Sequence, residues 1–260
     1  MSRRGVARVG APVGLVAVLT GVWELWVRLG GVDPAVFPAP SAVARALASQ
    51  ATALVGHAGT TLAETGIGLV LGILMGLGVA ALIAGWPLAR DGLEPLLVGL
   101  QTIPAVVLAP ILVLVLGFGW GPRIVVVIGV VFFPVAIAAA GAFTTTDRAR
   151  LELVRAFGAT PWQVFRTVVL PGSLPAIFDG IRISAAYALG SAAVAEQIGG
   201  AQSGIGLFIS RAQRNFRPDY VLAGVVVIAA LSLVIYALVG TVAHLLTPWN
   251  DTRTHPEPPA

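Results

Sequence analysis

The sequence predicts an all-α membrane protein with about six transmembrane helices. The chain of 260 residues is 57% hydrophobic and only 11% charged, with a mean hydropathy of +0.91, whereas soluble domains carry roughly 25% charged residues. Four stretches of more than 20 residues contain no Asp, Glu or Arg: 65–89, 95–122, 124–146 and 220–250. Each is long enough to cross about 30 Å of hydrocarbon, because a helical residue rises 1.5 Å.

The spans follow one another through most of the chain. We expect them at about residues 11–28, 63–86, 95–116, 123–143, 175–197 and 220–246, within a single transmembrane domain over 11–247. Residues 1–10 are predicted to form an N-terminal tail. Residues 248–260 are polar and rich in Pro, so we expect a disordered C-terminal tail.

The first span ends in charged and aromatic residues. Glu24 lies four residues before Arg28, so the two side chains can pair on one helix face near an interface. The basic start followed by uncharged residues 9–23 also allows a secretory signal, but this charged end favours a retained helix. Beyond it, Ser41 is predicted to cap a short helix over 41–55 that lies outside the membrane.

Six spans place both termini on one side, which should carry the excess of Arg in its short loops. Nine Arg fall on the side of the termini and five on the opposite side, so we expect cytoplasmic termini in a bacterial inner membrane. The cluster of Arg211, Arg214 and Arg217 fits this rule poorly, since it falls on the outer side.

Composition also excludes several functions. All 16 basic residues are Arg, so the chain lacks the Lys of a G-x-x-x-x-G-K-S/T nucleotide loop and cannot bind ATP by that route. It has no Cys, which removes disulfides and thiolate metal sites. The Arg residues flank apolar runs and form no patch with aromatic residues, so we expect no nucleic-acid partner.

The predicted cytoplasmic loop over 147–172 is polar, but its sequence strongly favours helix. Thr144 and Asp147 have the spacing of a capping box, and apolar residues then recur at helical intervals until Gly158 provides a C-terminal stop. The loop is therefore predicted to begin with a short helix that ends at this glycine.

A second short helix should follow at once. Thr160 and Gln163 form another capping box around Pro161 at the first helical position, and Pro171 should end the helix. Apolar side chains in such a loop need a covering surface, which is either a partner or the ends of the chain's own spans. These side chains are Trp162, Val164, Phe165, Val168 and Val169.

The loop resembles the signature of type I ABC importer permeases, which reads E-A-A, three residues, G, nine residues, I-x-L-P. Glu152 begins the match, Gly158 falls six residues later, and Leu170 and Pro171 occupy the end in register. The departures are apolar and keep the spacing: Leu153, Val154 and Val168.

The resemblance implies the type I permease fold and a coupling helix that inserts into a cleft of a separate ATPase. It also implies an assembly of two ATPases, two permeases, here expected to be a homodimer, and an external solute-binding protein. This chain would then be a transport subunit in contact with lipid, without enzymatic activity or cofactor. The implied coupling residues are Glu152, Val154, Arg155, Phe157, Gly158, Ala159, Thr160, Trp162 and Pro171.

The likeness covers about residues 23–246 and is closest to the nitrate, sulfonate and taurine branch, which also includes carriers of bicarbonate and pyrimidine precursors. It is carried by F-P-A-P-S at 37–41, Q-T-I-P at 101–104, A-E-Q-I at 195–198 and G-I-G at 204–206. The sequence does not single out one solute.

Polar groups inside a bilayer are costly, so they are candidates for lining a pathway. We select two in the third span and a helical face of the fifth, although helix packing explains that face equally well. Glu196 is open to three interpretations: solute contact, gating, or a wet position at the interface. The candidates are Gln101, Thr102, Ser184, Tyr187, Ser191 and Glu196.

Two other classes of membrane protein are alternatives to the hypothesis of an ABC importer permease. A secondary transporter needs carboxylates deep in the bilayer, whereas Glu24, Glu64, Glu94 and Glu196 lie near span ends. An intramembrane enzyme needs a nucleophile or metal site, but no paired His and carboxylate spacing marks a metal. The His residues lie outside spans or at their ends: His57, His244 and His255.

Overall fold

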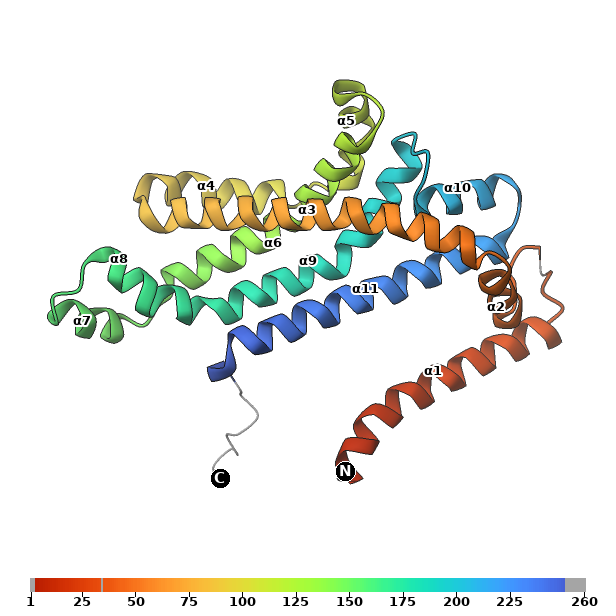
Figure 1. Cartoon of the computed structure of the whole chain (residues 1–260), viewed down its shortest axis with the longest axis horizontal. Coiled ribbons are helices and arrows are strands. Elements are labelled where there is room, and N and C mark those ends of the chain that lie inside the picture. Colours follow the sequence, from red (N-terminus) through yellow and green to blue (C-terminus); the bar gives the residue numbers. More distant parts are fainter. Residues whose placement is uncertain (1–2, 34, 251–260) are drawn as a thin grey trace. The chain divides into compact units, whose positions relative to one another are not determined.

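The computed structural model describes residues 3–33 and 35–250, and the described elements are helices (Figure 1). They fall into two compact units. One unit comprises Met1–Thr60 and Gln202–Val227, and the other comprises Thr61–Ala201 and Ile228–Ala260. The predicted tail beyond Asn250 lies outside the described residues.

The first unit contains α1 (Arg3–Leu29), α2 (Pro40–Ser49), the start of α3 (Ala51–Gly85), α10 (Ile205–Arg214) and the start of α11 (Pro218–Leu246). The predicted Glu24–Arg28 pair is confirmed at 2.5 Å. Ser41 is not the cap of α2, because the helix begins one residue earlier. Instead, the backbone N–H and Oγ of Ser41 donate to the Glu24 carboxylate at 2.9 and 2.8 Å, so the cap comes from α1.

The second unit contains the rest of α3 and α11 and the helices between them other than α10, in the order that Figure 1 colours along the chain. These are α4 (Pro87–Leu100), the 3₁₀ turn η1 (Ala105–Leu108), α5 (Ala109–Leu116), α6 (Trp120–Thr144), α7 (Arg148–Ala156), α8 (Pro161–Val164), the π-helix η2 (Phe165–Val169) and α9 (Leu170–Ile198). The 3₁₀ turn η3 (Pro248–Asn250) closes the described chain.

Close packing of α3 on α6 depends on glycine. A Cβ at Gly68, Gly72 or Gly76 would lie within about 3.0 Å of α6 atoms, whereas one at Gly66 or Gly78 would meet nothing within 4 Å. Small residues on one face let two helix backbones approach closely. Gly68, Gly72 and Gly76 therefore allow the close approach of α3 to α6.

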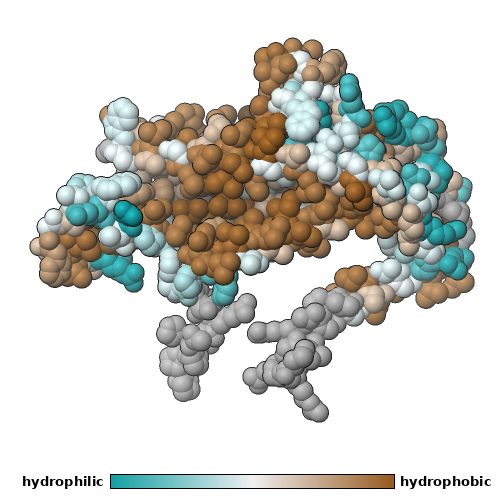
Figure 2. Space-filling view, viewed as in Figure 1, coloured by the Kyte–Doolittle hydropathy of each residue, from teal (hydrophilic) through white to brown (hydrophobic). Residues whose placement is uncertain are grey.

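Four helical runs among the described residues are long and apolar enough to cross a membrane: Ala51–Gly85, Trp120–Thr144, Pro161–Ile198 and Pro218–Leu246. They contain the predicted fourth, fifth and sixth spans, and the predicted second span, 63–86, except for its last residue. Figure 2 shows apolar side chains over much of the visible face. Exposed apolar residues of α3 and α4 include Leu74, 61% exposed, and Leu96, 58% exposed. A surface of this kind suits lipid tails better than water.

The predicted third span, 95–116, is not one helix. α4 starts at Pro87, contains Pro95 in its interior and ends at Leu100, and a bend over residues 101–104 leads into η1 and α5. Pro104 accounts for the break, because it lacks a backbone N–H and disfavours helical geometry at the preceding residue. The crossing of this segment and of α1 through a bilayer stays a prediction.

Candidate functional site

The loop between α6 and α9 contains the residues predicted to couple to an ATPase. Its first helix, α7, is capped by Asp147, whose Oδ1 accepts from the Ala149 N–H at 2.9 Å. The predicted capping box from Thr144 is wrong, since Thr144 still belongs to α6 and its Oγ1 donates to the Ala140 carbonyl at 2.9 Å. The short helix itself lies where the sequence placed it.

Gly158 ends α7 as predicted. Its φ of +80° lies in the left-handed region that glycine adopts without steric cost. The Gly158 N–H donates to the Arg155 carbonyl at 2.9 Å, and the Ala159 N–H reaches the Val154 carbonyl at 3.4 Å. These two bonds form a Schellman motif, so the turn between the helices has a defined geometry.

The second helix, α8, begins with the predicted capping box. The Thr160 N–H donates to Gln163 Oε1 at 2.8 Å, and the Gln163 N–H donates to Thr160 Oγ1 at 3.4 Å, with Pro161 at the first position. The predicted stop at Pro171 is wrong. α8 continues through η2 into α9, and the Leu170 N–H donates to the Phe165 carbonyl. The wide π turn moves the preceding carbonyls away from the Pro171 ring, which would clash with them in an ordinary α-helix.

Burial divides the apolar side chains of the loop into two groups. Val164 is buried, and Phe165 is half-buried with its ring 5.6 Å from that of Phe143 on α6. Phe157 is 84% exposed and Trp162 is 67% exposed. The chain's own helices thus cover part of the loop and leave two aromatic side chains on either side of Gly158 uncovered.

The other predicted coupling residues differ in exposure. Glu152, Arg155, Gly158 and Thr160 are exposed, while Val154, Ala159 and Pro171 are half-buried. Val154 and Pro171 also line an open cleft of about 530 Å³ between α7 and the start of α9. The loop therefore has charged, apolar and aromatic side chains among its exposed residues.

The predicted pathway residues do not form one cluster. Gln101 and Thr102 are exposed in the bend after α4. Ser184 and Ser191 are buried in α9, where Ser184 Oγ donates to the Gly180 and Val131 carbonyls at 2.9 and 3.2 Å. Tyr187, which was predicted to share their face, is 66% exposed.

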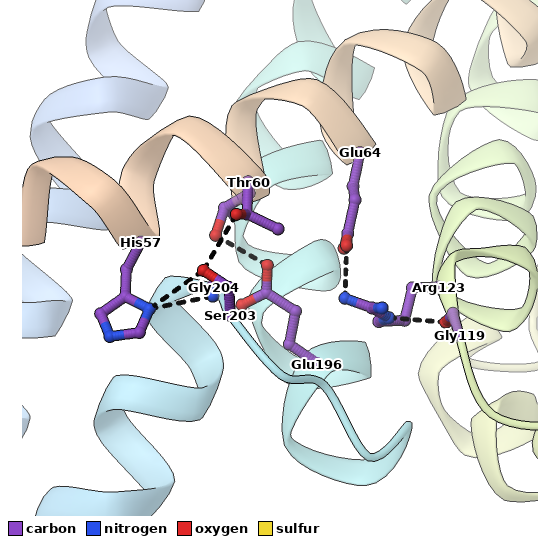
Figure 3. Close-up of polar contacts among 9 residues, drawn as sticks. His57, Thr60, Glu64, Gly119, Arg123, Glu196, Ser203 and Gly204 are labelled. Atoms are coloured by element: carbon purple, nitrogen blue, oxygen red, sulfur yellow. Dashed lines mark hydrogen bonds and ion pairs between the residues drawn. The ribbon is translucent and has the colours of Figure 1, made fainter.

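Glu196 is not at a wet interface, and this part of the sequence interpretation is wrong. The residue is 1% exposed, and Thr61 Oγ1 on α3 donates to its Oε1 at 2.7 Å. Nearby, Arg123 on α6 forms an ion pair with Glu64 on α3, and Arg123 Nε donates to the Gly119 carbonyl at 2.7 Å (Figure 3). We call Thr61, Glu64, Arg123 and Glu196 the buried polar cluster.

Sequence reasoning missed this cluster. The sequence places Glu64 and Arg123 at span ends, yet their side chains are 0% and 4% exposed. One signal was present: in the predicted topology Glu64, Arg123 and Glu196 all fall at the outer ends of spans, so they share one layer. Buried charges need partners, and three charged residues in one layer can provide them.

Comparison with known proteins defines the class. The chain has the fold of a type I ABC importer permease: it superposes on the permease of an inward-facing MetNI methionine ABC transporter with a TM-score of 0.65 and 21% identity, covering 76% of this chain and 98% of that one. Residues 68–250 match the family described as binding-protein-dependent transport system inner membrane component, and the chain belongs to this family.

Relatives cover almost the whole chain. It is 33% identical to a probable ABC transporter permease protein of Haemophilus influenzae, over 90% of this chain and 95% of the relative. It is 31% identical to the formylaminopyrimidine transport permease ThiX of Halalkalibacterium halodurans, over 91% and 94%. It is 28% identical to the taurine transport permease TauC of Escherichia coli, over 92% and 89%. The chain is thus a membrane permease component of an ABC importer for a small solute.

Proposed function

We propose that this permease moves a small solute across the bacterial inner membrane when the loop from Asp147 to Gly172 docks on a separate ATPase. The observation that carries the proposal is the exposed pair Phe157 and Trp162, held on either side of the Gly158 turn. Aromatic side chains are enriched at the centres of protein interfaces, where they fill pockets of the partner. The capped helices fix the pair before binding, which lowers the ordering cost of association.

The proposed assembly contains two ATPase subunits, a second copy of this permease and an external solute-binding protein, with both termini of the chain in the cytoplasm. ATP hydrolysis belongs to the partner, since this chain has no Lys for a nucleotide-binding loop. Purified alone, the chain should show no ATPase activity. Uptake by cells should need an intact ATPase partner.

The docking surface can be tested at Gly158. An Arg at this position faces open space but must adopt a φ of +80°, and it places a bulky charge between the two aromatic residues. Gly158→Arg should abolish co-purification with the ATPase while abundance in the membrane stays at the wild-type level. Gly158→Asn is the matched control, because Asn tolerates the left-handed conformation and should retain binding. Wild-type binding by Gly158→Arg would show that the contact lies elsewhere.

For the solute, we propose a small organic molecule, most simply a sulfonate such as taurine. This rests on the relatives: the permeases of Escherichia coli and Bacillus subtilis are named for taurine and aliphatic sulfonates, while that of Halalkalibacterium halodurans is named for formylaminopyrimidine. Uptake of labelled taurine, with the aminopyrimidine as competitor, tests the choice. Uptake of the pyrimidine alone would replace taurine by the second class of solute.

A gradient-driven carrier is the second candidate, and the buried carboxylates of Glu64 and Glu196 are the observation in its favour. Arg123 pairs with Glu64, however, which gives the Glu64 carboxylate a structural role in joining α6 to α3. An inactive ATPase partner should abolish uptake while the membrane potential is kept intact. Unchanged uptake would favour the gradient-driven mechanism.

A further inference from the structure

A second site lies in the unit formed by Met1–Thr60 and Gln202–Val227. It shares no residue with the loop from Asp147 to Gly172, which we call the coupling loop. It is a pocket of about 510 Å³ between the α2–α3 junction, α10 and the start of α11. This volume falls in the range of small-molecule pockets, about 300–1,000 Å³. Its lining contains no Asp or Glu and includes Gln50, His57, Phe208, Arg211, Arg217 and Tyr220.

Three rings form one wall of the pocket. The rings of His57 and Phe208 lie 5.9 Å apart, and those of Phe208 and Tyr220 stack at 6.1 Å. Gln50 Nε2 donates to the Tyr220 hydroxyl at 3.3 Å. The backbone N–H of Gly204 donates to His57 Nδ1 at 3.1 Å, as Figure 3 shows. The wall is therefore fixed by contacts from several helices, and its apolar part is the remaining exposed area of the buried Phe208 and the half-buried Tyr220.

The two Arg side chains of the lining differ in their partners. Arg217 donates to both carboxylate oxygens of Asp219 at 3.0 and 2.8 Å, and its guanidinium lies 3.9 Å above the Tyr220 ring. Its charge is thus balanced. Arg211 makes no ion pair within the part of the chain that the structure describes. The pocket therefore has one uncompensated positive charge.

The turn that carries Arg217 is strained. α10 ends in a Schellman motif, in which the Phe216 N–H donates to the Gln213 carbonyl at 3.1 Å and the Arg217 N–H donates to the Ala212 carbonyl at 2.9 Å. The left-handed position of this motif, normally glycine, is Phe216 with a φ of 51°. Strained residues of this kind gather at ligand clamps and other functional sites.

We propose that this pocket binds a small organic anion, with Arg211 contacting the anionic group and Phe208 and Tyr220 contacting the apolar body. Arg guanidinium groups recognise planar and tetrahedral oxyanions through paired N–H donors. The proposal also explains why an Arg cluster lies on the predicted outer side, against the usual charge bias. It depends on neither the ATPase contact nor the identity of the transported solute.

The test is calorimetric titration of the full-length chain, purified in detergent, with benzenesulfonate as the probe. Wild type should bind it saturably, and both inorganic sulfate and benzyl alcohol, which each carry one half of its chemistry, should bind more weakly. Arg211→Gln should weaken binding by about tenfold or more, the loss typical of a charged hydrogen bond. Arg214→Gln, on the same helix but outside the lining, should bind as wild type does.

Equal binding by wild type and Arg211→Gln would overturn the proposal, as would the absence of saturable binding by wild type. A role of Arg211 in docking the carboxylates of a protein partner predicts this second result, together with weaker binding of that partner to Arg211→Gln. Arg211 is exposed, so the variant should fold, and its thermal unfolding in detergent checks this point.

Discussion

The coupling loop and the buried polar cluster hold their critical side chains in opposite ways. In the loop, hydrogen bonds between near neighbours fix two short helices, and the aromatic pair Phe157 and Trp162 is left uncovered. In the cluster, Glu64 and Arg123 are buried and meet across 59 positions of sequence. The loop therefore leaves two aromatic side chains free for the contact with an ATPase that we propose, while the cluster joins helices within the chain.

The largest expected effect comes from breaking the cluster. Arg123→Gln leaves the Glu64 carboxylate buried without its cation and should cost about 3–5 kcal/mol of stability. Thermal unfolding of the purified chain in detergent measures the loss. The double variant Glu64→Gln, Arg123→Gln removes both charges and should recover part of it. A single variant as stable as wild type would mean that the pair does not hold α3 to α6.

The glycine contact between the same two helices gives the next largest effect. A Cβ at Gly72 would lie 2.7 Å from Val131 Cβ and 3.1 Å from the Ile128 carbonyl oxygen, so Gly72→Ala should destabilise the chain by about 1–3 kcal/mol. Gly78→Ala meets nothing within 4 Å and should be neutral or stabilising by up to about 1 kcal/mol. Equal melting temperatures for the two variants would contradict the close approach of α3 and α6.

A smaller effect is expected at the cap of α8. Thr160→Ala removes the acceptor of the Gln163 N–H and should cost about 1 kcal/mol locally, whereas Thr160→Ser keeps the cap. Hydrogen exchange of the loop amides detects the change. If exchange rises equally in both variants, the capping box does not order this helix.

The smallest effect on stability is expected at Trp162, where we expect a large effect on binding and almost none on folding. Trp162→Ala truncates an exposed side chain and should change the stability by less than about 0.5 kcal/mol. It should nevertheless weaken association with the ATPase by about tenfold or more. Leu114→Ala, at a position 86% exposed on α5, is the control and should leave association unchanged. If Trp162→Ala bound the ATPase as tightly as wild type, the aromatic pair would not be part of the interface that we propose.

The sequence predicted the loop better than the cluster for a physical reason. Gly158, Thr160 and Gln163 act on groups within five positions of themselves, so their spacing alone specifies the turn and the cap. The two errors in the loop, at Thr144 and Pro171, arise where α6 extends further and where a π turn replaces the α register. Neither the extension of α6 nor the π turn can be predicted from the spacing of neighbouring residues.

The cluster could not be predicted from local patterns, because its contacts depend on which helices pack together. Glu64 and Glu196 looked like residues at span ends, and only the packing of α3 on α6 and α9 buries them. The existence of the helices was readable from uncharged apolar runs, and the break after α4 falls at Pro104, a residue that disfavours continuous helix.

The π-helix η2 has a consequence for the direction of the loop. Each residue of an α-helix turns the chain by about 100° around the helix axis. One residue more or less between α8 and α9 would therefore rotate α7 and α8 about the α9 axis. Removal of one residue from Phe165–Val169 would turn Trp162 by roughly a quarter of a circle about the α9 axis. The π turn therefore determines the direction in which Trp162 points relative to α9.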